Sequence, residues 1–194
     1  TYSDAVTTVA RLKTGQVATV TDARSKVTTS TYDAAGRRTK VTDASGNWTE
    51  WTLDENGNAV AWTIHDEDAS NDAEHEWEAE YDALNRRTEL TEIDRTNGSN
   101  TLVTTTGWDS RSNMVWQVNA EGNPTRWTFD GLSRMTFKDV ALTVGSPITS
   151  FTTYVRTQWA FDKNNRLTSH KDDAANETTW AYDALDRATT TTYP

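Results

Sequence analysis

A short motif recurs along almost the whole chain and constrains the fold more than any other feature. Each copy has an aromatic residue or leucine, then Asp, two variable positions and a small residue suited to a turn. The seven copies place their first two residues at Tyr32-Asp33, Leu53-Asp54, Tyr81-Asp82, Trp108-Asp109, Phe129-Asp130, Phe161-Asp162 and Tyr182-Asp183, and a degenerate eighth copy lies at residues 11–15. A motif repeated in this way predicts an array of similar structural units.

The residue types of the motif indicate a β-hairpin turn. An Asp carboxylate can accept backbone N–H bonds inside a type I turn, and the fourth position from it requires a residue that tolerates positive φ. That position is occupied by Gly36, Gly57, Asn85, Ser112, Ser133, Asn165 and Asp186. Five of these seven are Gly, Asn or Asp, which visit the left-handed region most easily. Catalytic acids would not restrict the fourth position, so we interpret the aspartates as turn formers.

A second turn lies between successive copies of the motif. It is clearest from Asp43 to Gly46, and weaker versions begin at Asp22, at Asn119 (ending with Gly122) and at Asp172. Asp43 follows Asp33 by ten residues, and Asp54 follows Asp43 by eleven. The repeating unit is therefore 21 residues long and contains two strands.

The strands between these turns have a composition typical of β-sheets. Threonine supplies 36 of the 194 residues, and β-branched and aromatic side chains fit a pleated surface. Thr49, Trp51 and Leu53 share one face by the period of two. The same pattern recurs at Thr125, Trp127 and Phe129, at Thr157, Trp159 and Phe161, and at Thr178, Trp180 and Tyr182. Alternate strands are about 10 Å apart, so these aromatic residues cannot all touch directly, but with the intervening strands they should form a ladder along the sheet. We predict an all-β fold.

The number of strands predicts curvature. The pattern gives about sixteen antiparallel strands of six or seven residues, and an open twisted sheet rarely exceeds about ten strands without curling. The expected fold is a spiralling curved sheet, a segment of a hollow shell or tube. Three units are longer than 21 residues, with loops replacing the second turn at about His65–Glu74, Asp94–Asn100 and Ala141–Thr149, and these insertions should decorate one rim of the ribbon.

Composition limits the possible classes of function. The net charge of −10 disfavours nucleic-acid binding, which needs a basic surface. Cysteine is absent, so disulfides do not hold the fold, and no apolar stretch approaches the ~18 residues of a membrane span. We expect residues 1–194 to form one continuous array. Because the chain starts at Thr1 and stops where another connector should begin, we expect it to be part of a longer chain.

The sequence offers only weak metal sites. The loop from Asp66 to Glu74 has oxygen ligands at alternate positions, but Asn71 replaces the calcium loop's glycine and Trp77 replaces its closing glutamate. His65 and His75 bracket this loop, and two histidines ten residues apart do not define a zinc or nickel site. We interpret the loop as solvated and acidic, expect His170 to lie in a strand, and predict no metal and no cofactor.

The sequence has features that carbohydrate binding or enzymatic activity would also require. The chain has nine tryptophans, and Trp beside Asp can stack against a sugar ring, so a carbohydrate-binding surface is one alternative. The recurrence of Trp in one register favours a structural ladder instead. The sequence has no nucleophile elbow, phosphate loop or cysteine nucleophile, and carboxylate pairs among 29 acidic residues are expected by chance, so we predict no enzymatic activity.

The repeat resembles the YD-repeat, or RHS-repeat, family of large surface and toxin proteins. The matching residues are the Tyr-Asp-Ala-x-x-Arg cores at Tyr32, Tyr81 and Tyr182, and the Asp-Ala-x-Gly-Asn connector at 43–47. The resemblance covers roughly residues 15–194. The chain departs from the bacterial members in having no Asp-Pro-x-Gly segment at which such shells cleave themselves, and residues 1–194 contain no toxin payload after the repeats.

The resemblance implies a structural wall, secreted or on the cell surface. Family members wind such repeats into a spiral sheet that closes a shell, and several enclose a toxin. An extracellular fibre, filament or adhesin is the alternative. The expected partners are neighbouring repeats of the same chain or other copies joined end to end, because edge strands such as residues 189–193 are templates for further strands. An enclosed toxin or a surface glycan is a further possible partner.

Overall fold

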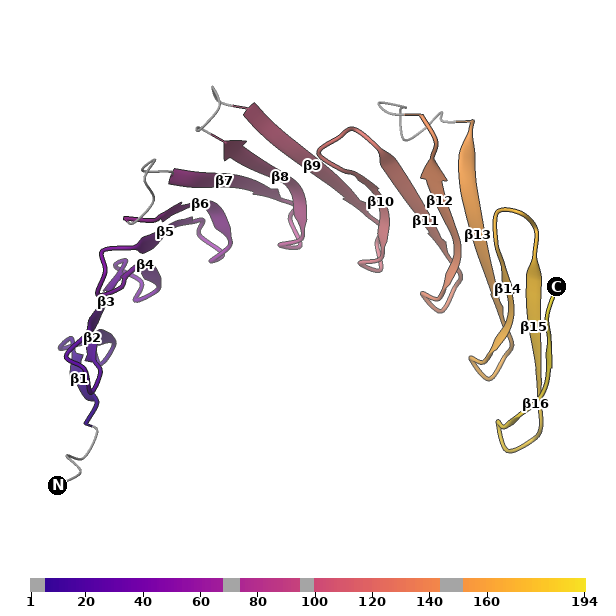
Figure 1. Ribbon diagram of the computed structural model, residues 1–194, viewed down its shortest axis with the longest axis horizontal. Coiled ribbons are helices and arrows are strands. Elements are labelled where there is room, and N and C mark those ends of the chain that lie inside the picture. Colours follow the sequence, from indigo (N-terminus) through magenta and orange to yellow (C-terminus); the bar gives the residue numbers. More distant parts are fainter. Residues whose placement is uncertain (1–5, 68–73, 95–99, 144–151) are drawn as a thin grey trace. The chain divides into compact units, whose positions relative to one another are not determined.

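The computed structural model describes residues 6–67, 74–94, 100–143 and 152–194. Within this part of the chain there are sixteen β-strands and no helix (Figure 1). The strands are β1 (Thr8–Arg11), β2 (Val17–Thr21), β3 (Val27–Tyr32), β4 (Arg38–Thr42), β5 (Trp48–Leu53), β6 (Ala59–His65), β7 (Glu74–Tyr81), β8 (Arg87–Asp94), β9 (Asn100–Trp108), β10 (Met114–Val118), β11 (Pro124–Phe129), β12 (Met135–Ala141), β13 (Tyr154–Phe161), β14 (Leu167–Lys171), β15 (Glu177–Tyr182) and β16 (Ala188–Thr192). The predicted all-β class is confirmed.

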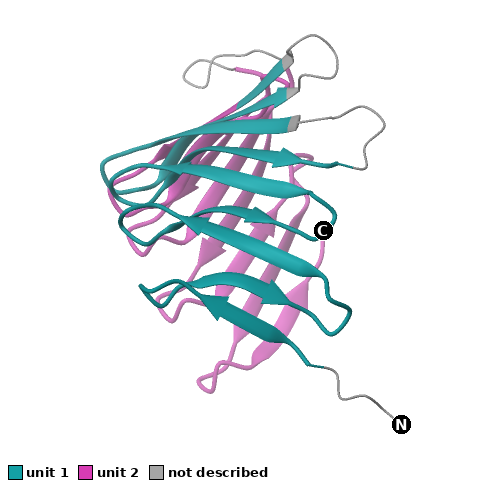
Figure 2. Ribbon diagram, turned by 90° about the vertical axis from the view of Figure 1, so that its left-hand side faces the viewer, with its two compact units in different colours: residues 1–103 teal, residues 104–194 magenta. Residues whose placement is uncertain are grey.

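The chain divides into two compact units, residues 1–103 and 104–194 (Figure 2). In the first unit, β1 to β8 pair antiparallel in the order of the sequence. In the second unit, which begins within β9, the strands from β9 to β16 do the same. Each unit is therefore a single antiparallel sheet that bends from strand to strand (Figure 1). The expectation of one continuous array over residues 1–194 stays a prediction.

Strand lengths differ from the expected six or seven residues. β1 has four residues and β9 has nine. The turns at the two ends of a strand limit its length. β10 and β14 each lie between two tight turns, which leave room for five residues. Strands beside an insertion continue pairing before the chain leaves the sheet, and β7, β8 and β13 therefore have eight.

In some strands one face is more covered than the other. In β5, Thr49, Trp51 and Leu53 are half-buried, whereas Glu50 and Thr52 on the opposite face are exposed. Among the described residues few side chains are buried: the hydrophobic ones are Ala79 and Ala141. A single-layer sheet has no second layer to pack against, so lateral contacts between neighbouring strands must supply much of its stability.

No helix in the described part of the chain is long and apolar enough to cross a membrane.

Candidate functional site

The motif aspartates close the hairpin turns that follow the odd-numbered strands. In the turn after β3, Asp33 Oδ1 accepts a bond from the Arg37 backbone N–H at 2.8 Å, and the Asp33 backbone N–H donates to the Arg37 carbonyl at 2.9 Å. The Gly36 N–H donates to the Asp33 carbonyl at 3.0 Å, and Gly36 has φ of 81°. The register between β3 and β4 shifts at Tyr32, as a turn of this kind with a bulge requires.

The fourth position has positive φ in every turn that the structure describes. In the motif turns the residues with positive φ are Gly15, Gly36, Gly57, Asn85, Ser112, Ser133, Asn165 and Asp186. In the connector turns, which follow even-numbered strands, they are Ser25, Gly46, Gly122 and Ala175. The restriction on this position in the sequence therefore has a backbone origin.

The structure places the other predicted motif residues at equivalent positions. Asp54, Asp82, Asp109, Asp130, Asp162 and Asp183 each accept the backbone N–H of the fifth turn residue through Oδ1, as Asp33 does. In the connector after β4, Asp43 Oδ1 accepts the Asn47 N–H at 3.0 Å. The insertions follow β6, β8 and β12, so all three replace an even-strand turn as predicted, and most of their residues lie outside the described ranges.

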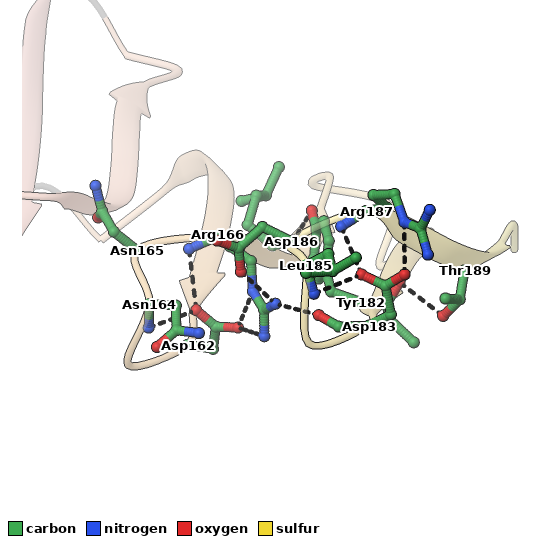
Figure 3. Close-up of polar contacts among 12 residues, drawn as sticks. Asp162, Asn164, Asn165, Arg166, Tyr182, Asp183, Leu185, Asp186, Arg187 and Thr189 are labelled. Carbon is green, nitrogen blue, oxygen red and sulfur yellow. Dashed lines mark hydrogen bonds and ion pairs between the residues drawn. The ribbon is translucent and has the colours of Figure 1, made fainter.

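The fifth residue of the motif turn bonds to the next motif turn. The guanidinium of Arg134 pairs with Asp130 in its own turn at 2.6 Å, donates to the Asp162 carbonyl at 2.8 Å, and lies 4.9 Å from the centre of the Phe161 ring. Arg166 makes the corresponding contacts with Asp162, the Asp183 carbonyl at 3.0 Å and the Tyr182 ring at 4.7 Å (Figure 3). We call the hydrogen bonds from the fifth residue of one motif turn to the next motif turn the turn-to-turn bonds.

Asparagine and glutamine at the fifth position also make turn-to-turn bonds, through their side-chain amides. Asn58 Nδ2 donates to Asp54 in its own turn and to Asn85 Oδ1 in the next at 2.9 Å. Asn113 Nδ2 bonds likewise to Asp109 and to Ser133 Oγ at 3.1 Å. The repeat pattern did not by itself indicate a role for the fifth position. Its occupants Gln16, Arg37, Asn58, Arg86, Asn113, Arg134, Arg166 and Arg187 are all long or amide-bearing polar residues, a signal that could have revealed it.

The tyrosines of the motif add a second bond between hairpins. The hydroxyl of Tyr32 donates to the Val17 carbonyl at 2.8 Å, and that of Tyr182 to the Leu167 carbonyl at 2.7 Å. Each acceptor is the first residue of the strand that follows the preceding motif turn. Tyr81 bonds in the same way to Ala59 at 3.1 Å. A Phe at this position, as at Phe161, has no hydroxyl to donate.

These contacts favour the ionised form of the turn aspartates. The backbone N–H and the guanidinium of Arg37 hold the pKa of the Asp33 carboxyl below its usual value. The amide of Asn58 is the main cause that lowers the pKa of Asp54, and the guanidinium of Arg134 has this effect on the pKa of Asp130. Hydrogen bonds to the charged form lower an acid's pKa, so these carboxylates contribute to stability only when deprotonated.

The tryptophans stack on neighbours within the sheet. Trp62 and Trp77, directly opposite on β6 and β7, have ring centres 5.7 Å apart and planes inclined by 10°. Trp51 is paired with Trp62 across β5 and β6, while Trp159 lies 5.7 Å from His170 in β14. The row Trp51, Trp62 and Trp77 crosses adjacent strands, whereas Trp127 and Trp180 pair with Lys138 and Thr191. Among the described residues, the recurring tryptophans therefore face different side chains in different repeats, and a row of rings across adjacent strands is seen at Trp51, Trp62 and Trp77.

The residues considered for metal binding have other contacts where the structure describes them. The His65 ring stacks on Trp48 at 5.2 Å, and its Nε2 lies 3.2 Å from Glu67 Oε2. The His75 ring lies 6.0 Å from that of Trp77. Most of the acidic loop lies outside the described residues, and among those described no group of three or more His, Cys, Asp or Glu side chains could hold a metal ion.

Comparison with known proteins identifies the repeat. The family model described as RHS Repeat matches residues 13–47 and 161–194. No curated protein sequence matches the chain.

Solved structures that resemble the chain include a complex of TcdB2, TccC3 and Cdc42, with 11% identity and a TM-score of 0.42. They also include TcdB2–TccC3 without the hypervariable C-terminal region, with 12% identity and a TM-score of 0.41, and a Tc holotoxin pore of Photorhabdus luminescens, with 11% identity and a TM-score of 0.40. Each similarity covers 93% of this chain, which spans 12% of the length of the matched chain.

Proposed function

Since this chain belongs to the RHS-repeat family, we propose that it is a structural, non-catalytic segment of a β-repeat wall. The turn-to-turn bonds are the observation that carries this proposal. Arg134 and Arg166 each join their own aspartate to the main chain of the next motif turn, so one hairpin is tied to the following one. A repeat array gains stability from such nearest-neighbour contacts and needs no thick hydrophobic core.

We further propose that the wall encloses another polypeptide, which is a toxin in the bacterial members of the family. We also propose that the protein is secreted or displayed on the cell surface. These proposals are supported by the family and by a sheet that is a single layer within each unit. The test is limited proteolysis and electron microscopy of the natural protein that carries this chain. We expect an enclosed segment that resists protease until the repeats are unfolded. A protein with no enclosed density and no protected segment would contradict the enclosure.

A second candidate is a fibre or filament built by end-to-end pairing. It is favoured by β16, all five residues of which are exposed, and which pairs with β15 at the end of the strand order. Such an edge accepts further strands. Light scattering and electron microscopy of the 194-residue chain should detect concentration-dependent, end-to-end association. A monodisperse monomer at high concentration would refute this candidate.

Carbohydrate binding has less support than either. A sugar ring stacks on the face of an aromatic ring, and the faces of Trp62 and Trp77 that point toward each other are already in contact. We expect neither saccharides nor millimolar Ca²⁺ to raise the melting temperature. A rise of several degrees with either would show a binding site that stabilises the fold.

A further inference from the structure

Tight turns determine strand register in most of this protein, but two hairpins within single units lack them. A five-residue turn fixes which residues face each other in the strands that it joins. Between β12 and β13 the chain instead passes through residues 142–153, and between β6 and β7 through residues 66–73. A long connection leaves register undetermined by the turn, so another interaction must specify it.

Asp139 lies in β12 between two arginines, directly opposite Arg126 of β11 and Arg156 of β13. Arg156 binds the carboxylate with two nitrogens, Nε at 2.6 Å from Oδ1 and Nη2 at 2.8 Å from Oδ2. Arg126 Nη2 donates to Oδ2 at 2.9 Å. The Asp139 side chain is 1% exposed, whereas those of Arg126 and Arg156 are 37% and 36% exposed.

This arrangement is unusual for a strand. Aspartate is disfavoured in strand interiors, and a buried carboxylate is costly unless it is paired. Burial alone would raise the pKa of Asp139, but the hydrogen bonds from Arg156 and Arg126 outweigh it and lower the pKa, so the carboxylate is charged. Arg156 also lies 4.8 Å from the Phe137 ring centre and 5.0 Å from that of Tyr154, which restricts its position.

The strands of the two arginines are joined to β12 by different kinds of connection. Arg126 is joined to Asp139 through the tight turn at residues 130–134, so its register is set locally. Arg156 lies beyond the long connection. A slip of two residues between β12 and β13, the smallest that keeps each side chain on its face, would place Tyr154 or Gln158 opposite Asp139. Neither can replace the two-nitrogen contact of an arginine with the buried carboxylate.

The hairpin with the other long connection, β6 and β7, also has a specific cross-strand contact between side chains. Trp62 and Trp77 face each other across β6 and β7 and stack at 5.7 Å. A slip of two residues would place His75 or Ala79 opposite Trp62 and break this contact. Each long-connection hairpin within a unit therefore has a specific cross-strand contact between side chains.

We propose that Asp139 is a register-determining residue, which through Arg156 selects the pairing of β12 with β13 where no turn does so. A single buried polar group that selects one register is the best-attested use of such groups. The inference does not depend on the proposed function, because register is a property of the sheet itself.

The absence of cysteine from the chain permits a direct test. Val140 and Val155 face each other on the side of the sheet opposite to Asp139, so the pair V140C and V155C reports the native register by forming a disulfide. The pair V140C and T157C reports a slip of two residues. Each pair is oxidised in the otherwise natural chain and with D139A, and mass spectrometry measures the cross-linked fraction. Circular dichroism monitors folding.

We expect D139A to lower the ratio of native to slipped cross-link on the order of tenfold. The triple variant R126M, D139L and R156M removes all three charges, so no buried charge is left unpaired, and we expect it to fold but to show the same loss of register. If D139A does not fold, the triple variant decides the question. A natural ratio in either folded variant would overturn the proposal.

The control is the hairpin of β4 and β5, which has a tight turn at residues 43–47. There Glu50 pairs across the strands with Lys40 at 3.0 Å. With the reporter pair V41C and T49C, which are opposite each other, E50A should leave the cross-linked fraction unchanged. A loss of cross-linking in E50A would mean that any cross-strand ion pair affects register, and the special role of Asp139 would be refuted.

Discussion

Most turn aspartates use both carboxylate oxygens within a few residues of themselves. In the connector turn after β14, Asp172 Oδ1 accepts the Asn176 backbone N–H and Oδ2 accepts the Asn176 side-chain amide, both at 2.8 Å. The adjacent Asp173 is exposed. Two neighbouring aspartates of equal charge thus have different structural roles, which allows the turn function to be separated from the effect of charge.

We expect D172A to lower the melting temperature by about 2–4 °C, because the Asn176 backbone N–H loses its side-chain acceptor. D173A removes the same charge without removing a turn contact and should leave the melting temperature nearly unchanged. Thermal unfolding followed by circular dichroism compares the two. Equal effects would show that charge, and not turn formation, explains the recurrence of aspartate.

The conformational free energy of the positive φ at the fourth turn position depends on which residue occupies it. Ala175 has φ of 66°, a conformation that disfavours any side chain with a Cβ. We expect A175G to stabilise the protein by about 0.5–1 kcal/mol, after allowing for the greater freedom of glycine in the unfolded chain. A174G, one residue earlier, should be neutral or destabilising. Urea denaturation measures both, and a destabilised A175G would contradict the backbone explanation.

At the scale of the elements, the turn-to-turn bonds and close side-chain packing join neighbouring strands and hairpins. Arg166 reaches the next motif turn through the Asp183 carbonyl and Asp186, and its side chain is 21% exposed. Arg187 occupies the same position in its own turn, binds Asp183, and is 73% exposed. A comparison of the two arginines therefore separates the bond within a turn from the bond between turns.

We expect R166K to lower the melting temperature more than R187K does. A lysine at residue 166 has one ammonium group in place of a planar guanidinium and cannot bond to Asp162, Asp183 and the Tyr182 ring in the same way. Hydrogen exchange should accelerate at the turns of residues 162–166 and 183–187 in R166K. Equal effects of the two substitutions would contradict a role for these arginines in joining hairpins.

The close packing between β9 and β10 can be tested by substitution of a glycine. Trp116 lies over Gly107, and a Cβ at residue 107 would lie 2.0 Å from Trp116 Nε1. We expect G107A to destabilise the protein by about 1–3 kcal/mol, as overpacking does. Gly131 has open space around its Cβ position, so G131A is the matched control and should be neutral or slightly stabilising. Denaturant unfolding distinguishes them, and a G107A protein as stable as G131A would contradict this packing.

Across the whole molecule, the lowered pKa values of many turn aspartates predict acid sensitivity. Hydrogen bonds within the turns lower the pKa below its usual value for Asp33, Asp43, Asp54, Asp82, Asp109, Asp130, Asp162, Asp172 and Asp183. For a group with a lowered folded-state pKa, the contribution to stability is complete above the unfolded-state pKa and is lost as the pH falls through the folded-state pKa.

We therefore expect the free energy of unfolding to be constant with respect to these groups above about pH 5 and to fall steeply below about pH 4. Urea denaturation at intervals from pH 7 to pH 2.5 measures it. In D172A the loss between pH 4 and pH 2.5 should be smaller than in the natural chain, because one of the contributing carboxylates is gone. Stability that persists to pH 2.5 would show that the turn contacts do not depend on ionisation.

The sequence by itself determined the features that rest on local backbone chemistry. The spacing of Asp33, Asp43 and Asp54 predicted the strand count, and the residue types at the fourth positions predicted the turn conformation, because both depend on residues only a few positions apart. The recurrence of Arg and Asn at the fifth position was visible as well, but its meaning was not. The acceptors lie one repeat further along, main-chain carbonyls for the arginines and side-chain oxygens for the asparagines, and a one-dimensional pattern does not show which groups lie side by side.

Tertiary structure decided which tryptophans touch and which arginines share a carboxylate. Trp62 stacks on Trp77, and Asp139 lies between Arg126 and Arg156, only because the strands pair in one register across long connections. The lengths of those connections do not specify that register, so the sequence pattern did not show which rings stack or that an aspartate would be buried between two arginines. Turn chemistry can be recognised from the sequence because it is local, whereas cross-strand contacts depend on pairing between strands that no tight turn joins.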